Sequence, residues 1–219
     1  MVDAMTWGWR CALVCGSIVA VACQDNVATH FPPGLEPLEE NAAPVPPRGP
    51  SSEELMLVSS DGEHKWVHGR GFIQAPPALV WAASKDPEHM VADCETSSHA
   101  ATVGVEPGYE FGFQMHYEVD DILNVAWDEL WRYGTIEGVI EAPEFAIIRY
   151  QKVYGSDFIS NLEGSAIFLS TDVAGRTELE LIEHLTALGG NVDHMKRSMQ
   201  HRFDTLLAVV HGRDIPPCP

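Results

Sequence analysis

Three charged residues of this chain stand in line with apolar side chains, where a strand would carry them toward a protein interior. Glu129 falls between Trp127 and Trp131 in an alternating run, Glu183 keeps the register of three leucines, and Arg149 shares a strand face with two apolar residues. Burial raises the pKa of a carboxyl group, so a carboxylate in a pocket could act as acid or base. The carboxylates could equally orient a ligand hydroxyl or pair with Arg149. The open alternative is that a strand end or a bulge turns these residues to solvent.

The familiar catalytic and metal-binding patterns are missing from the sequence. It contains no G-x-S-x-G, no H-E-x-x-H, no phosphate loop and no dinucleotide fingerprint. The ten histidines are scattered. His64 and His68 would share one strand face, whereas His194 and His201 fall off the apolar stripe of the last expected helix. We therefore expect no metal and no cofactor.

Composition describes an acidic chain with enough apolar residues for one core. There are 219 residues, of which 45% are hydrophobic, and 32 acidic residues outnumber 13 basic ones, for a formal charge of −19. This length suits one domain and a tail. An acidic surface repels nucleic acid and anionic lipid head groups, so nucleic acid is not an expected partner.

The N-terminal 22 residues have the features of an export signal. Arg10 precedes an apolar run that is too short for a transmembrane helix and suits the centre of a signal peptide. The run ends Ala-Val-Ala-Cys at Cys23, which resembles the lipobox of bacterial lipoproteins. That resemblance implies an exported, membrane-anchored lipoprotein that begins at a lipidated Cys23. Because Gln24 follows, the outer membrane is favoured where the host has two. A plain signal peptide and an uncleaved anchor stay open.

The segment after Cys23 is predicted to be a flexible tether. Residues 24–53 are rich in proline and acids and show no apolar period, so residues 23–60 are assigned to the tether and 61–219 to the folded domain. Cys11 and Cys15 would be removed with the signal, and Cys23 would carry the lipid. In an oxidising compartment the two cysteines that remain, Cys94 and Cys218, are expected to form a disulfide. Two separate thiols are the alternative.

The folded part has an α+β pattern. A strand at 63–74 precedes two short helices that begin at prolines within 75–94, and alternating runs then predict a series of antiparallel strands. Residues 191–212 carry an apolar stripe with steps of three and four residues, which predicts one long helix. The expected strands of that series are 110–119, 125–136, 144–155, 161–172 and 176–188.

Residues 72–90, "FIQAPPALVWAASKDPEHM", resemble the START-like or SRPBCC superfamily in their order of strand, Ala-Pro, apolar-Trp pair and Asp-Pro. The resemblance implies a helix-grip fold, in which a curved antiparallel sheet wraps a long C-terminal helix and leaves an apolar cavity. Together with the lipobox and the tether, it implies membrane-tethered binding or transport of a hydrophobic small molecule or lipid. The alternative is a cyclase or dehydratase that uses Glu129 or Glu183. The expected walls are Phe111, Phe113, Met115, Trp127, Trp131, Leu181, Met195, Met199 and Phe203.

The lipidation of Cys23 can be tested directly. Metabolic labelling with a fatty-acid probe should mark the wild-type chain and leave a Cys23→Ser variant unmarked, because only that thiol would form the thioether. A Cys11→Ser variant, altered within the removed segment, should label like the wild type. Equal labelling of the wild type and the Cys23→Ser variant would contradict the prediction.

Overall fold

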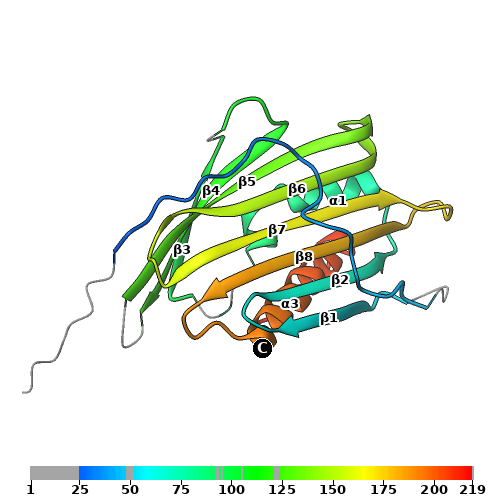
Figure 1. The fold of residues 1–219 in the computed structure, drawn as a ribbon. Helices are drawn as coiled ribbons and strands as arrows, with labels where there is room; N and C mark the ends of the chain where they lie inside the picture. The colour runs from blue at the N-terminus through cyan, green and yellow to red at the C-terminus, as the bar shows by residue number, and fades with distance from the viewer. Residues whose placement is uncertain are drawn as a thin grey trace, which may run out of the picture.

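The computed structural model describes residues 25–47, 52–91, 94, 96–104, 106–120 and 124–218, so the signal segment and Cys23 lie outside the described residues. The main element is one antiparallel sheet of eight strands, in the order β1-β2-β8-β7-β6-β5-β4-β3, which curves around the C-terminal helix (Figure 1). The strands are β1 (Leu55–Asp61), β2 (Lys65–Ile73), β3 (Ser98–Val103), β4 (Phe111–Asp120), β5 (Asn124–Val139), β6 (Ala142–Gly155), β7 (Ile159–Ser170) and β8 (Thr177–Ala187). The helices are α1 (Pro77–Ser84), α2 (Pro87–Met90) and α3 (Val192–Val210).

Helix α3 lies against β1 and β2 because two glycines of β2 leave room for it. A Cβ atom on Gly69 would come within 2.8 Å of the Met199 sulfur, and one on Gly71 within 2.6 Å of the Phe203 ring. The apolar stripe of α3 therefore packs directly on the β2 backbone. The helix begins at Asn191, whose side chain caps it by accepting a hydrogen bond from the main-chain N–H of Asp193.

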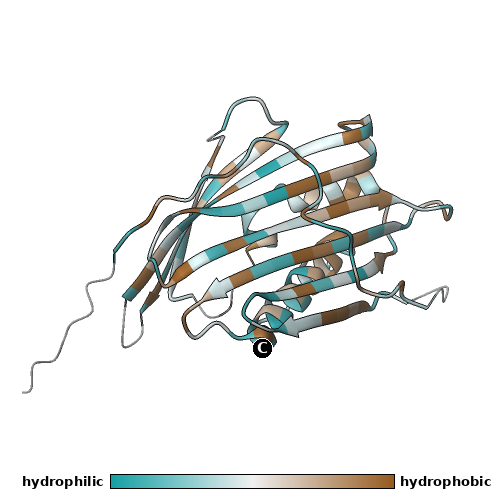
Figure 2. Ribbon diagram, viewed as in Figure 1, coloured by the Kyte–Doolittle hydropathy of each residue, from teal (hydrophilic) through white to brown (hydrophobic). Residues whose placement is uncertain are grey.

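This arrangement confirms the predicted α+β helix-grip fold. The two short helices follow β2, the antiparallel run follows them, and the long helix closes the chain. Along the strands, hydrophobic residues alternate with hydrophilic ones, as expected when a sheet buries one face against a helix (Figure 2). The predicted boundary at residue 61 is wrong, since β1 lies inside the predicted tether and pairs with β2. That strand is only partly buried, so its sequence carries little alternation.

The N-terminal segment, residues 25–47, is also not a free tether, because it crosses the outer face of the sheet (Figure 1). At its start, the N–H of Val27 donates to the carbonyl of Gly155 over 2.8 Å. Further along, Phe31 is only 8% exposed, and the guanidinium carbon of Arg132 lies 3.7 Å from its ring centroid. At its far end, the amide of Asn41 donates to the carbonyl of Gly69 over 2.9 Å.

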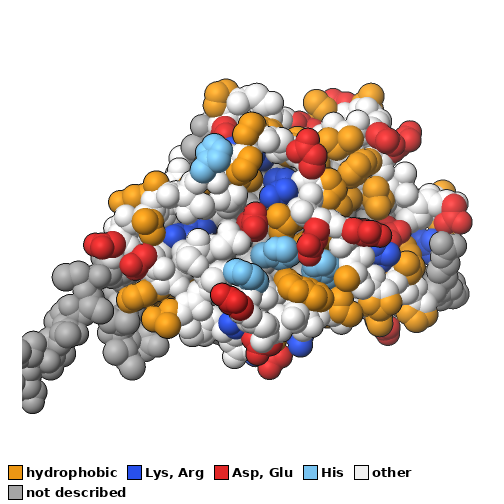
Figure 3. Space-filling model, in the orientation of Figure 1, with side chains coloured by type: hydrophobic (Ala, Val, Ile, Leu, Met, Phe, Trp, Pro, Cys, Tyr) orange, Lys and Arg blue, Asp and Glu red, His pale blue; other side chains and the backbone are white. Residues whose placement is uncertain are grey.

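The sequence misled here because proline-rich chain without an apolar period is typical of a linker. An extended segment can nevertheless be held where side chains of a sheet satisfy its backbone polar groups. Arg132, Arg149 and Gln151 donate to carbonyl oxygens of this segment. On the face that the segment crosses, acidic, apolar and histidine side chains are interspersed, and lysines and arginines form only small separate groups (Figure 3).

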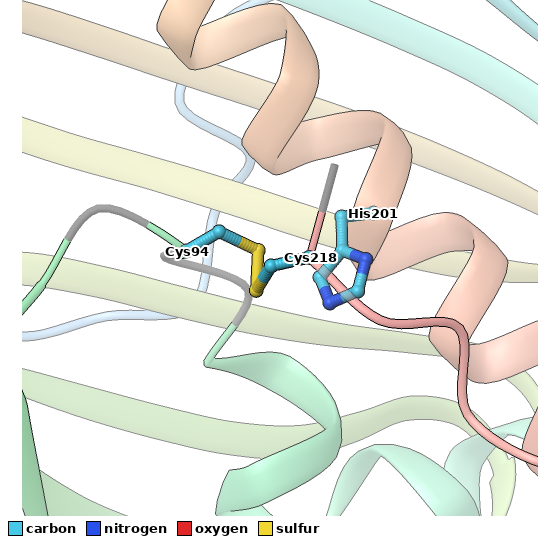
Figure 4. A group of neighbouring side chains, drawn as sticks. All are labelled: Cys94, His201 and Cys218. Carbon is cyan, nitrogen blue, oxygen red and sulfur yellow. A yellow bond between two sulfur atoms is a disulfide. The ribbon is translucent and has the colours of Figure 1, made fainter.

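A disulfide joins Cys94 to Cys218, the pair expected from the sequence, with an S–S distance of 2.02 Å. It ties the chain after α2 to the C-terminus, and His201 of α3 lies beside it (Figure 4). With both sulfurs in this bond, the group cannot offer two thiolates to a metal ion. Among the described residues, no helix has the length and apolar character needed to cross a bilayer.

Removing the disulfide should lower the free energy of unfolding. The two cysteines are 124 residues apart, so the chain-entropy model allows a loss of up to about 4–5 kcal/mol in a Cys94→Ser/Cys218→Ser variant. Denaturant unfolding measures this loss. A reductant should destabilise the wild type by a similar amount and leave the double variant unchanged. Free thiols at both positions in non-reducing peptide maps would contradict the assignment.

Candidate ligand cavity

A cavity of about 540 Å³ opens between the sheet and the beginning of α3. It lies at the end of the molecule where β4 and β5 meet, β6 turns into β7, and β8 leads into α3. Most of its walls are apolar or aromatic. A small polar group stands among them, made by Glu129, Tyr150, Glu183 and Arg202, and His194 and Ser198 of α3 also line the cavity.

Glu129 is held by two indole rings from its own strand. The Nε1–H of Trp127 donates to Oε1 over 2.8 Å, and that of Trp131 donates to Oε2 over 3.1 Å. These residues share a face because side chains two apart in a strand point to the same side. The carboxyl group is 3% exposed. Burial raises its pKa to about 7, with a further rise from Glu183, while the Trp127 hydrogen bond and the Arg202 charge oppose the shift.

Arg202 forms the centre of a second set of contacts. Its Nη1 donates to the Tyr150 hydroxyl over 3.1 Å, and its Nε donates to the carbonyl of Met90 over 2.9 Å. The Tyr150 hydroxyl donates to Glu183 Oε2 over 2.7 Å, and Nη2 of Arg202 lies 3.6 Å from the same oxygen. Burial would lower the pKa of Arg202, but Tyr150 and Glu183 outweigh it and raise that pKa, so the side chain stays cationic.

The two carboxyl groups therefore differ in what they can do. Glu183 is engaged by Tyr150 and Arg202 and acts as the counter-charge of the buried cation. Glu129 accepts two indole hydrogen bonds, and its pKa of about 7 means that it exists in both protonation states near neutral pH. When protonated, it can donate a hydrogen bond to a ligand oxygen in the cavity. When ionised, it can accept one or take a proton.

The predicted wall residues fall into two groups. Trp127, Met195, Glu129 and Glu183 line the cavity, as expected. The others do not line it and belong instead to the packed interior or its edge. Trp131, for example, stacks between the rings of Phe113 and Tyr150 at centroid distances of 5.3 and 4.2 Å. Those outside the lining are Phe111, Phe113, Met115, Trp131, Leu181, Met199 and Phe203.

The alternation placed these residues on the correct side of the sheet but at the wrong position along it. The lining on β4 is Tyr117 and Val119, further along the strand than the predicted Phe113 and Met115. Each step of two residues moves a side chain by about 7 Å without changing its face. Periodicity therefore cannot predict how far along a strand the cavity lies.

The prediction for Arg149 is wrong, because this side chain lies on the outer face. Its Nε donates to the carbonyl of Gly164 over 3.1 Å, and its Nη1 donates to that of Glu36 over 2.9 Å. Strand β6 is apolar on both faces: Ile147 and Ile148 are neighbours, and both are fully buried. The N-terminal segment covers the outer face, so alternation could not decide which side faces the cavity.

Two polar residues of the site, Tyr150 and Arg202, were missed. Arg202 stands seven residues after Met195 and three after Met199, which places it beside the predicted apolar stripe of the helix. That position beside the apolar stripe could have indicated that Arg202 is buried. An arginine next to an apolar stripe is usually read as a side chain that reaches solvent, and only the neighbouring Glu183 and Tyr150 show that this one is buried.

The fold and this site define a helix-grip protein with an internal cavity. No family model matches the chain, and no curated protein matches its sequence. It is similar to the solved structure of TTHA0849 from Thermus thermophilus, with 19% identity, 68% of this chain and 95% of that one covered, and a TM-score of 0.45. It is also similar to the Zhui aromatase/cyclase from Streptomyces sp. R1128, with 16% identity, 68% of this chain and 92% of that one covered, and a TM-score of 0.44. A third similar structure is the human StarD13 lipid transfer and protein localization domain, with 12% identity, 73% of this chain and 88% of that one covered, and a TM-score of 0.43. Identities this low transfer neither a ligand nor a reaction to this chain.

The raised pKa of Glu129 gives stability a defined pH dependence. Because the pKa rises from 4.5 to about 7 on folding, the folded protein holds the extra proton between these values. The corresponding stability is present below pH 4.5 and is lost as the pH rises to 7, by roughly 3 kcal/mol. A Glu129→Gln variant should lack this loss.

Denaturant unfolding of both proteins between pH 4.5 and pH 7.5 measures the effect. The stability of Glu129→Gln relative to wild type should increase with pH. The exposed Glu144 provides a matched control, since Glu144→Gln should stay at a constant offset from wild type. Parallel curves for Glu129→Gln and wild type would show that Glu129 keeps an ordinary pKa.

Proposed function

We propose that this protein binds a hydrophobic small molecule or lipid in the cavity, with one polar group of the ligand at Glu129. The observation that carries the proposal is the cavity of about 540 Å³ with apolar walls and one buried polar group. Its volume falls within the range of about 300–1,000 Å³ typical of small-molecule sites, which are mostly apolar with a few placed polar groups.

The polar group favours a ligand with a neutral oxygen, such as a hydroxyl or a carbonyl. The positive charge of Arg202 is already matched by Glu183, Tyr150 and a main-chain carbonyl. A ligand carboxylate would lie near two carboxyl groups without a free cation among these four side chains. A neutral ligand oxygen can instead accept a hydrogen bond from protonated Glu129 or donate one to its ionised form.

Lipidation at Cys23 belongs to the same proposal. A lipid anchor would hold the protein at a membrane, where hydrophobic ligands are concentrated. The support for the anchor is the sequence around Cys23, and the fatty-acid labelling described above tests it independently of ligand binding.

Acid–base catalysis of the cyclase or dehydratase type is the second candidate, favoured by the pKa of about 7 at Glu129. A general acid or base works best when its pKa lies near the working pH. Native mass spectrometry of the purified protein separates the two candidates. A carrier releases its ligand with unchanged mass, whereas an enzyme converts the bound compound, for example with loss of water.

Filling the cavity should abolish binding. Ser198 lines it from α3, so Ser198→Trp should occupy the space and remove binding of a fluorescent sterol probe, which has a neutral hydroxyl. Arg197→Trp, one residue earlier at an exposed position, is the matched control and should bind like the wild type. Met199→Trp is unsuitable, since Met199 packs on β2.

Fluorescence titration with folded variants, verified by circular dichroism, gives the result. Wild type and Arg197→Trp should saturate with the probe, and Ser198→Trp should not. Absence of saturable binding to the wild type, or equal binding to all three proteins, would overturn the proposal.

A further inference from the structure

The N-terminal segment starts at the end of the molecule that holds the cavity (Figure 1). The carbonyl of Asp25 accepts a hydrogen bond from the N–H of Asp157 over 2.9 Å, in the turn between β6 and β7. The next residue of that turn, Phe158, lines the cavity, and its carbonyl accepts from the N–H of Leu188, another lining residue. Asp25 is thus hydrogen-bonded to Asp157, whose neighbour in the chain, Phe158, lines the cavity.

Cys23 precedes Asp25 by two residues. Consecutive Cα atoms are 3.8 Å apart, and an extended chain advances about 3.3–3.6 Å per residue. The Cα atoms of Cys23 and Asp25 are therefore at most about 7 Å apart. Because residues 25–47 are bonded along the sheet, a lipid on Cys23 would hold the cavity end beside the bilayer, and not at the end of a long tether.

This end also carries exposed apolar side chains. Leu188 is 77% exposed, Tyr154 48% and Val27 44%. Hydrogen bonds of the local backbone connect them: Val27 donates to the residue after Tyr154, and Leu188 donates to Phe158. We refer to Val27, Tyr154, Phe158 and Leu188 as the rim. An apolar rim at the end of a ligand cavity leaves part of its surface in water unless something covers it.

We propose that the rim docks on the lipid bilayer to which Cys23 is attached, so that the cavity exchanges its ligand directly with that bilayer. This inference rests on the proposed binding of a hydrophobic ligand and on the proposed anchor. The occupant is a lipid surface because the anchored end of the chain begins at the rim. Asp25 and Asp157 are exposed beside it, so the matching surface has uncharged or zwitterionic head groups.

A second exposed apolar site provides an internal control. Val139 and Ile140, at the turn from β5 to β6, are 60% and 52% exposed. Strand β5 starts at the cavity and has 16 residues, so this turn lies about 50 Å along the strand from the cavity end. Docking by the rim leaves this turn in water, whereas unspecific adsorption of apolar residues involves both sites.

The experiment uses residues 24–219 with an N-terminal hexahistidine tag in place of Cys23, bound to phosphatidylcholine vesicles that contain a nickel-chelating lipid. This attachment reproduces the short connection without requiring natural acylation. Leu188→Cys and Val139→Cys variants carry an environment-sensitive nitrobenzoxadiazole label, and spin-labelled lipids serve as quenchers. Titration of the unlabelled protein with a fluorescent sterol, whose polar group is a neutral hydroxyl, tests the cavity separately without vesicles.

The label at 188 should shift to the blue and be quenched several-fold more strongly than the label at 139. A flexible insertion of twenty Gly and Ser residues before Asp25 should reduce this quenching, because it lowers the effective concentration of the rim at the surface. Equal quenching at both sites, or none at 188, would overturn rim docking even if the sterol binds. Quenching at 188 without sterol binding would refute the proposed ligand and leave docking as a contact with lipid alone. An unchanged signal after the insertion would refute the role of the short connection.

Discussion

The cavity depends on a difference in length between one helix and the sheet that it must cover. Helix α3 has 19 residues and is about 28 Å long, whereas the 16 residues of β5 extend over about 53 Å. The apolar stripe of the helix is engaged with β1 and β2, where Gly69 and Gly71 allow close contact. At the end of β4 and the start of β5, the concave face of the sheet is therefore not packed directly against the helix, and the space left between the sheet and the beginning of α3 is the cavity.

A buried cation at the margin of this space determines its chemistry. Arg202 can remain ionised away from water because Glu183, Tyr150 and the carbonyl of Met90 surround it. One carboxylate balances this charge, so the nearby Glu129 gains little from it and is penalised by burial and by Glu183. The same set of contacts thus engages Glu183 with Arg202 and Tyr150 and leaves Glu129 close to its protonation midpoint at neutral pH.

The outer face of the sheet explains the behaviour of the N-terminal segment. Strand β6 has apolar residues on both faces, and the segment covers the outer ones while arginine side chains of the sheet bind its carbonyl oxygens. The hydrogen bonds that hold the segment across this face also fix residue 25 at the end of the molecule where the cavity lies. The position of residue 25 relative to the cavity follows from that arrangement, not from the length of the segment.

The sequence by itself determined the features that depend on local periodicity. Alternation and the three–four spacing predicted strands β2 and β4 to β8 and the long helix, because these patterns repeat within a few residues. The helix-grip class was predicted from the resemblance of residues 72–90, and the direction of Glu129 and Glu183 stayed open at that point. Only the tertiary structure decided how far along the strands the empty space lies, that Arg149 faces outward under the N-terminal segment, and that Arg202 is buried. Each of these depends on which distant segment covers a given face, and no spacing within one element carries that information.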